Sequence, residues 1–428
     1  MKRYFVKMKV EHIVIMMLTT VICLSIPNVK SQSLNNLYKK SQIQLEESTD
    51  YATNNDWQKL FPDADKVEYG KKTGLTKEIV VAPDGSVFMC HKTLYEIWKF
   101  DKNGNFIKKF GSKGSKPGQF PFHFSIFGLL DGKYLCTFDN QGRMMFFDTE
   151  GRFIKKLKLD YMPLDMVALK NSKIAILGFL VGKNGKHIVS IKDFNTGKEK
   201  IIWTKSEENI FKSAVVVTLP NHGGMMSWSI PFCHSSFTTP KLAMSKTGNL
   251  LLGMPDDGNI IEYTPEGNKV KTFTLKIEPL TITEAEINEN YALFVKKSDE
   301  FAARINKDDK FSPSETQESI QQFKSQLNKI KDRNTYPKHL PYFSSLIIDS
   351  DGNILVFEFT KGEETNKFKA YTYDNAGNEI GTSSFVSDNY ELSFIPSTFA
   401  FSNGNIYTVS IRKNAGKMPL RLVKFRLT

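Results

Sequence analysis

One stretch of twelve residues occurs twice in this chain, and the repetition limits the folds that the chain can adopt. Residues 100–111 read FDKNGNFIKKFG and residues 147–158 read FDTEGRFIKKLK, with aromatic, turn and basic positions nearly in register. A short apolar segment that begins after a glycine turn precedes each copy. Short apolar runs separated by glycine turns predict antiparallel strands joined by tight hairpins.

The same order of apolar segments and glycine turns occurs six times along the chain, although the residues differ from unit to unit. The four further units begin near Met166, Lys241, Ser345 and Thr398. A unit of four short antiparallel strands that recurs about every 40–50 residues is typical of a β-propeller blade, because one small sheet cannot bury both of its faces alone. The sequence therefore predicts an all-β fold, a six-bladed β-propeller over residues 61–428.

The last unit has room for only three strands, ending in LRLVKFRLT. A fourth strand is needed there, since an open strand edge would otherwise remain exposed. The segment KVEYGKK, Lys66–Lys72, alternates suitably just before the first unit. We expect this segment to pair with the C-terminal strand at Leu422–Leu427 and to close the ring, which leaves residues 32–60 as an N-terminal linker.

Two connections between units are much longer than the others, at about Thr204–Phe237 and Lys276–Tyr342. Both join the last strand of one blade to the first strand of the next, so both should lie around one mouth of the central channel. The second predicts a helical hairpin between blades 4 and 5, because Thr283–Glu286 and Ser312–Glu315 are capping boxes followed by apolar residues at helical spacing. This hairpin either rests on the rim or serves as a lid or docking element.

The first insertion holds the most distinctive candidate binding residues. Its segment NHGGMMSWSIPFCHSSF places Trp228 and two histidines beside glycine-rich backbone. Aromatic rings in this setting suit stacking on sugars or peptides, and they equally suit packing over the mouth. His123, His234 and His339 each precede the first strand of a blade, where they could converge on a metal, act as general bases or remain separate. The predicted ligand-binding residues are Trp228, His234, His339, His123 and His222.

No catalytic signature accompanies these residues. The chain has no GxSxG elbow, HExxH pair, phosphate loop or EF-hand loop. Asp349, Asp351 and Asn353 have the spacing of a calcium loop, but no acidic residue follows at the required distance, which favours a structural turn. No catalytic residue, metal ligand set or cofactor is predicted.

The N-terminal residues predict export. Basic residues are followed by a mainly apolar run, Ile13–Ile26, and then by a polar segment. This order is that of a signal peptide, and the run of about 14 residues is shorter than the roughly 20 that a membrane-spanning helix needs. We expect cleavage after Ser31, so that residues 1–31 are removed. Lipidation at Cys23 is the alternative, although Ile22 stands where the lipid-attachment motif requires a small residue.

The charge of the chain narrows the choice of partners. The formal net charge of the full chain is +12, part of which belongs to the leader. A basic surface favours acidic partners such as anionic polysaccharide or lipid, or it simply keeps a β-rich surface soluble. Nucleic acid is not expected as a partner of an exported chain.

Cys90 and Cys136 lie within apolar strands, so they are expected to be buried free thiols rather than part of a disulfide framework.

The segment DKNGNFIKKFGSKGSKPGQF, residues 101–120, resembles the consensus of NHL-type repeats, in which an FG..G...GQF loop links successive blades. Without its leader, the whole chain is similar to the six-bladed, NHL-like β-propeller proteins that bacteria export, a family mostly without assigned activity. The resemblance implies this architecture throughout. The loop motif occurs only in blade 1, so the resemblance implies no binding residues in blades 3 to 6.

These observations favour an exported binding module over an enzyme. Its insert-bearing face would recognise a glycan, a peptide or an envelope protein, without a cofactor and without spanning a membrane. One alternative is a hydrolase or lyase with a metal in the central channel, as in some similar propellers. Another alternative is a structural component of an envelope complex. Fold alone does not decide among these functions, because propellers host many of them.

The order of the N-terminal segments leads to a first testable prediction. The exported protein should begin near Gln32 and be unlipidated, because a signal peptidase would cut after Ser31. N-terminal sequencing of exported material measures this directly. A chain that begins at a lipid-modified Cys23 would contradict the assignment.

Overall fold

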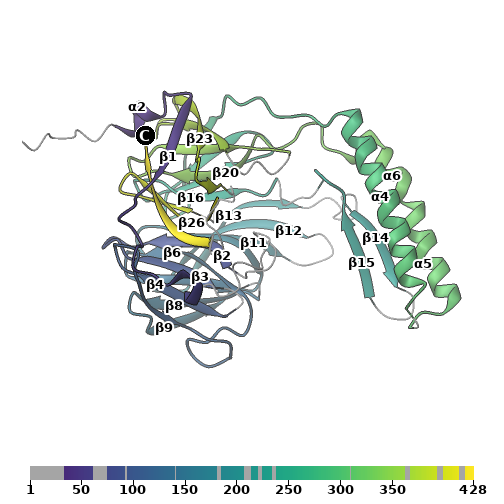
Figure 1. Cartoon of the computed structure of the whole chain (residues 1–428), viewed down its shortest axis with the longest axis horizontal. Helices are drawn as coiled ribbons and strands as arrows, with labels where there is room; N and C mark the ends of the chain where they lie inside the picture. The colour runs from purple at the N-terminus through teal and green to yellow at the C-terminus, as the bar shows by residue number, and fades with distance from the viewer. Residues whose placement is uncertain are drawn as a thin grey trace, which may run out of the picture.

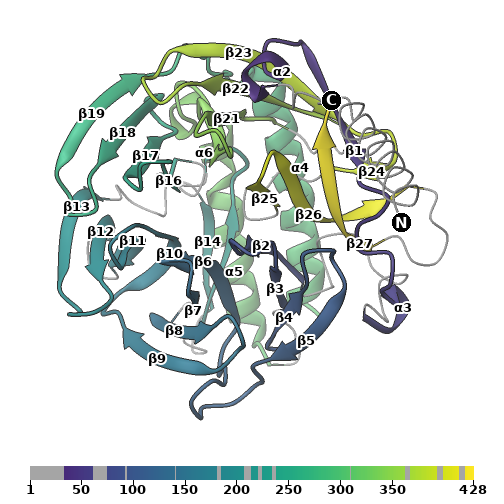
Figure 2. The ribbon, with the colours of Figure 1, turned by 90° about the vertical axis from the view of Figure 1, so that its left-hand side faces the viewer.

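The computed structural model describes residues 33–60, 75–91, 94–139, 141–180, 185–206, 214–219, 224–233, 238–308, 310–361, 367–392, 399–413 and 420–428. These residues form a ring of six blades with a helical subdomain on one side (Figure 1). Seen along the ring axis, the first and last blades lie side by side, and helices cross behind the centre (Figure 2). The predicted six-bladed, all-β fold with a helical insertion between blades 4 and 5 is confirmed.

Each blade is a four-stranded antiparallel sheet whose innermost strand faces the channel. From the channel outward, blades 1 to 3 consist of β2 (Leu75–Val81), β3 (Val87–His91), β4 (Glu96–Phe100) and β5 (Phe106–Phe110); β6 (Phe124–Leu130), β7 (Tyr134–Asp139), β8 (Arg143–Asp148) and β9 (Phe153–Lys158); and β10 (Met162–Ala168), β11 (Lys173–Leu180), β12 (Lys186–Asp193) and β13 (Glu199–Ser206).

Blades 4 to 6 have the same plan. They consist of β16 (Lys241–Met244), β17 (Leu250–Met254), β18 (Asn259–Tyr263) and β19 (Lys269–Thr274); β20 (Phe343–Ile348), β21 (Ile354–Glu358), β22 (Lys367–Tyr373) and β23 (Glu379–Val386); and β25 (Phe399–Ser402), β26 (Asn405–Arg412), β27 (Leu420–Leu427) and β1 (Gln42–Glu47). The short strand β24 (Tyr390–Glu391) also pairs with β26, and the short helices α2 (Leu34–Leu37) and α3 (Trp57–Leu60) flank β1 along the chain.

The core of the ring lies between neighbouring blades. An apolar cluster of described residues fills each interface around the ring. At the interface of blades 1 and 2, Phe88 and Cys90 of β3 meet Phe124, and Cys90 is buried and forms no disulfide, as predicted. The alternate residues Val87 and Met89 pack against blade 6 instead. Because side chains alternate along a strand, each sheet is buried on both faces, which explains the nearly continuous apolar runs.

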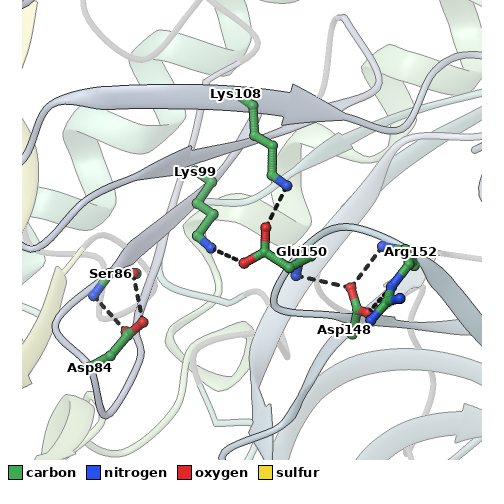
Figure 3. Close-up of polar contacts among 7 residues, drawn as sticks. All are labelled: Asp84, Ser86, Lys99, Lys108, Asp148, Glu150 and Arg152. Carbon is green, nitrogen blue, oxygen red and sulfur yellow. Dashed lines mark hydrogen bonds and ion pairs between the residues drawn. The ribbon is translucent and has the colours of Figure 1, made fainter.

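The repeated stretch of sequence forms the outermost hairpin of blades 1 and 2. In blade 2, Asp148 Oδ1 accepts the backbone N–H groups of Glu150 at 2.9 Å and Arg152 at 2.8 Å (Figure 3). Asp101 accepts the equivalent bonds in blade 1. The fourth position of the turn is Gly151, whose φ of 81° lies in the left-handed region that favours glycine. Both copies of the stretch therefore place a carboxylate first and a glycine fourth in this turn.

The basic positions of the repeat connect each of blades 1 to 4 to the next blade. A lysine of the outermost strand donates a hydrogen bond to the outer turn of the following blade. These donors and acceptors are Lys108 and Glu150 Oε2 (2.7 Å), Lys155 and the Phe194 carbonyl oxygen (2.5 Å), Lys200 and the Gly267 carbonyl oxygen (3.0 Å), and Lys271 and the Asn375 carbonyl oxygen. Hydrogen bonds from Lys108 and Lys99 lower the pKa of Glu150 to about 2 (Figure 3).

The ring is closed by an N-terminal strand. β1 pairs antiparallel with β27, where Leu45 lies opposite Leu427, and parallel with β23, where Ile43 lies opposite Phe385. Ile43 and Leu45 are buried in the cluster between blades 5 and 6. β1 therefore serves as the fourth strand of blade 6 and contacts blade 5 as well.

The position of the closing strand differs from the sequence prediction. The predicted segment, Lys66–Lys72, lies outside the described residues, and the strand that pairs with β27 is β1. Residues 32–60, expected to be a linker, contain this strand and the helix α2, whose Leu34 and Leu37 are buried. QIQLEE and KVEYGKK both alternate apolar and polar residues, so the pattern alone could not choose between them.

The two insertions fold together into one subdomain. The first supplies the hairpin of β14 (Ala214–Leu219) and β15 (Gly224–Ser229), and the second supplies α4 (Glu284–Ile305), α5 (Pro313–Ser325), α6 (Leu327–Lys331) and the 3-10 helix η4 (Arg333–Thr335). Both predicted capping boxes are present, at the first turns of α4 and α5. A separate apolar cluster, which includes Val215, Phe294 and Phe323, joins the hairpin to the helices.

Closure through β1 leads to a prediction about stability. Leu45→Ala removes a buried side chain from the interface of blades 5 and 6, so it should lower the free energy of unfolding by about 2–5 kcal/mol. Gln42→Ala, at an exposed position of the same strand, should change it by less than about 0.5 kcal/mol. Calorimetric unfolding measures both variants. An unchanged transition for Leu45→Ala would mean that β1 does not hold the ring together.

Candidate functional site

The inner strands of all six blades surround a cavity of about 900 Å³. Most of its wall is apolar, with at least one apolar residue from each inner strand. These include Ile79 of β2, Ile126 of β6, Leu164 of β10, Met244 of β16, Leu346 of β20 and Phe399 of β25. Leu164 and Met244 are each 39% exposed, so they face open space rather than a packed core. A cavity of this size and lining is typical of a small-molecule site.

Two residues of opposite charge face this cavity from neighbouring blades. Asp165 lies in the middle of β10 in blade 3, and Lys241 is the first residue of β16 in blade 4. Among the described residues that line the cavity, these two alone carry a charge. The backbone N–H of Met166 donates to Asp165 Oδ1 at 2.8 Å. Within the described part of the chain, Asp165 and Lys241 form no direct ion pair with each other.

Burial controls the protonation of both groups. Loss of hydration inside the channel raises the pKa of Asp165 to about 6, while the Met166 N–H and the Lys241 ammonium act in the opposite direction. Burial likewise lowers the pKa of Lys241, and the Asp165 carboxylate opposes that change. A carboxyl group that titrates near neutral pH can accept or donate a proton, and beside an ammonium group it can bind a ligand with two charges.

The structure places Trp228 inside the insertion subdomain. Its half-buried ring packs edge to face against Phe301, at 5.3 Å between centroids, and Phe323, at 4.8 Å. Phe301 belongs to α4 and Phe323 to α5, so the indole joins β15 to both helices. This arrangement corresponds to the packing role that the sequence left open beside ligand stacking.

The structure does not bring His123 and His339 together. His123 is exposed and stacks on the Tyr95 ring at 5.2 Å, whereas His339 contacts the Tyr342 ring, also at 5.2 Å between centroids. These histidines precede the inner strands of blades 2 and 5, which are opposite each other in a six-bladed ring. His222 and His234 lie outside the described residues.

A metal ion would need several ligating side chains gathered in one place. No group of three or more His, Cys, Asp or Glu side chains among the described residues is placed to hold one. In the stretch DSDGN, Asp349 Oδ1 accepts the backbone N–H groups of Asp351 and Asn353, each at 2.8 Å. This is the turn seen at Asp101 and Asp148, so the stretch is the structural turn that the sequence favours.

Sequence reasoning missed Asp165 and Lys241. A usable signal existed for Asp165, because it is a lone carboxylate within MPLDMVALK, an apolar strand expected to be innermost in its blade. Lys241 was harder to recognise from the sequence as a cavity residue, since lysine at the first position of a strand is commonly exposed. Only the arrangement of the six inner strands places the two residues in one cavity.

The ring and its axial cavity define the chain as a six-bladed β-propeller. Residues 76–253 match the family model DUF5128, described as a 6-bladed beta-propeller. No functionally curated protein matches the chain in sequence.

Solved structures share this fold at low sequence identity. A member of the DUF4221 family from Bacteroides vulgatus is 13% identical, with a TM-score of 0.50, and the match covers 91% of this chain and 99% of that one. A protein from Bacteroides fragilis described as exported is 12% identical, with a TM-score of 0.44 and coverage of 84% and 92%. Virginiamycin B lyase from Staphylococcus aureus is 12% identical, with a TM-score of 0.39 and coverage of 90% and 100%. Likeness at this level concerns the fold alone.

Among the described residues, no helix combines the length and the apolar character that crossing a bilayer requires.

The raised pKa of Asp165 leads to a prediction about pH. The folded pKa of about 6 exceeds the ordinary value of 3.8, so the folded state holds an extra proton between these values and loses stability as pH rises through them. Asp165→Asn removes the buried charge and should be more stable than wild type at pH 7.5 by roughly 1–3 kcal/mol, with a smaller difference near pH 4. Thermal unfolding at both pH values measures this.

The matched control is Asp160→Asn, at an exposed position just before β10. It makes the same chemical change outside the cavity and should show little difference at either pH. If Asp165→Asn gave the same gain in stability at pH 4 as at pH 7.5, the carboxyl would not titrate as described.

Proposed function

We propose that this protein is exported and acts as a binding module that recognises its ligand with the insert-bearing face. One observation carries the proposal: insertions from two separate blade connections fold together into a single subdomain over one end of the channel (Figures 1 and 2). The ring does not need them for closure, because each blade has four strands without them. Elaboration of one face on a rigid scaffold is a common way to build a recognition surface.

Specific contacts attach the subdomain to the ring. Lys361, which follows β21 of blade 5, forms an ion pair with Glu286 at the start of α4, with 2.7 Å between Nζ and Oε1. The hydrogen bond from Lys361 lowers the pKa of Glu286 to about 2. Phe359, from the same connection, is buried in the apolar cluster of the subdomain. A charged contact and an apolar contact from one connection together orient the subdomain on blade 5.

The hairpin of the subdomain has one packed face and one exposed face. Val215, Val217 and Trp228 pack toward the helices. Met225, which is 59% exposed, and Ser227 point the other way. In Figure 1 the hairpin lies between the helices and the ring, on the side of the subdomain nearer the blades. Apolar and hydroxyl side chains on one surface suit contact with a peptide, a glycan or another protein.

Export is supported by the order of residues 1–31, in which basic residues, an apolar run and a polar segment follow one another. The ligands available to an exported protein are envelope or extracellular glycans, peptides and proteins. The net charge of the chain stays positive without residues 1–31, which hold five of the basic residues and one of the acidic ones, and a positive charge favours the acidic members of these classes.

A binding experiment with matched variants tests this proposal. Candidate glycans, peptides and purified envelope proteins are titrated against the protein without its leader. Met225→Glu alters the exposed face without touching the subdomain core, so it should weaken binding of a true ligand at least tenfold, which corresponds to about 1.4 kcal/mol. Trp228→Ala should weaken binding as well, because it loosens the packing of β15 on the helices.

The control is Asn403→Ala, in the short turn between β25 and β26 at the opposite end of the ring. This variant should bind as wild type does, and thermal unfolding should show that all variants remain folded. Loss of binding only in Asn403→Ala, or no loss in Met225→Glu, would place recognition on another face.

A further inference from the structure

We propose that the axial cavity is a second, separate binding site, which takes a small zwitterionic ligand with an apolar body, such as a short apolar peptide. In this site the ligand's ammonium group lies against Asp165 and its carboxylate lies against Lys241. The site is formed by the inner strands of the ring, so it does not depend on the recognition face described above.

The protein leaves both charges of the cavity incompletely paired. Within the described residues, the Lys241 ammonium has no hydrogen-bond acceptor. The Asp165 carboxylate interacts with the backbone N–H groups of Met166 and Leu242, which are uncharged donors. A charge held in a partly dehydrated cavity costs free energy unless an opposite charge or hydrogen bonds compensate for it. A ligand that brings a carboxylate to Lys241 and an ammonium to Asp165 would supply this compensation.

The rest of the wall favours an apolar ligand body over a sugar. Leu164, next to Asp165, and Met244, at the end of the strand that begins with Lys241, are both partly exposed to the cavity. Of the hydroxyl groups in the wall, that of Ser344 is already directed to the carbonyl oxygens of Phe357 and Glu358, at 3.3 Å and 3.2 Å. The larger part of the wall is apolar, so apolar groups of a ligand would gain free energy by leaving water there, whereas hydroxyl groups would not.

The two charges select a zwitterion rather than a simple anion or cation. Asp165 and Lys241 stand on adjacent inner strands, β10 and β16, and interact electrostatically with each other. An anion bound to Lys241 alone would be repelled by Asp165, and a cation bound to Asp165 alone would be repelled by Lys241. A molecule that carries both charges satisfies both residues at once.

Access to the site is from the end of the channel that bears the subdomain. Lys241 is the first residue of β16 and follows the first insertion directly, so it lies toward that end. At the other end, the turns between the first two strands of neighbouring blades are hydrogen-bonded to one another. These contacts join Ser172 to Asp131, Lys170 to the Lys246 carbonyl oxygen, Lys246 to the Asp351 carbonyl oxygen, and the Gly404 N–H to Ser350.

Calorimetric titration with the dipeptide Leu-Leu tests the proposal, using the protein without its leader. Leu-Leu should bind saturably at one site per chain. N-acetyl-Leu-Leu, which lacks the ammonium, should bind wild type at least tenfold more weakly, but should bind Asp165→Asn about as well as Leu-Leu does. Leu-Leu amide, which lacks the carboxylate, should bind wild type at least tenfold more weakly than Leu-Leu does. It should bind Lys241→Met about as well as Leu-Leu does.

Matched controls make the same charge changes at exposed positions, Asp160→Asn and Lys269→Met, and these should retain the wild-type preference for the zwitterion. Met225→Glu should also bind Leu-Leu normally, which separates this site from the proposed recognition face. The proposal is wrong if folded wild type does not bind Leu-Leu, or if the penalty for acetylation is as large in Asp165→Asn as in wild type. It is equally wrong if Met225→Glu abolishes binding while Asp165→Asn does not.

Discussion

Every blade of this ring depends on its neighbours for burial, because a small four-stranded sheet has two apolar faces and can shield neither of them. In β3, Phe88 packs against blade 2 while the adjacent Val87 packs against blade 6. The requirement is satisfied only when the ring closes. β1 closes it by pairing with β27 of blade 6 and β23 of blade 5, so that the described N-terminal residues link the last two blades. The stability of the interfaces is therefore coupled to this one strand.

A second set of contacts acts at the outer edge of the ring and explains why only two blades still share an obvious sequence. The outer turns of blades 1, 2 and 5 are held by an aspartate that accepts two backbone N–H groups, as at Asp148, and that of blade 4 by the hydroxyl of Thr264. The lysine from the preceding blade donates to a side chain, Glu150, in blade 2, but to backbone carbonyl oxygens in blades 3 to 5. A backbone acceptor is present whatever the side chain is, so the turns could diverge in sequence while the contact was kept.

The two ends of the ring differ in what they offer to a ligand. At one end, short turns are hydrogen-bonded to one another. At the other end, two insertions form a subdomain with its own core, anchored to blade 5 through Lys361 and Glu286. Between the ends lies a mainly apolar cavity with Asp165 and Lys241 in its wall. A buried carboxylate whose pKa is raised opposes folding at neutral pH, and such residues are concentrated at functional sites.

The blades, the outer turns and the two capped helices follow from the sequence, because each rests on contacts within a few residues: alternation along a strand, a glycine at positive φ, or a side chain that caps the next turn. Three features were decided by tertiary structure. β1 rather than Lys66–Lys72 pairs with β27, since two alternating segments look alike until one is buried. Trp228 packs against Phe301 and Phe323 because the two insertions meet. Asp165 and Lys241, on separate blades, share one cavity only because the ring brings their strands together around its axis.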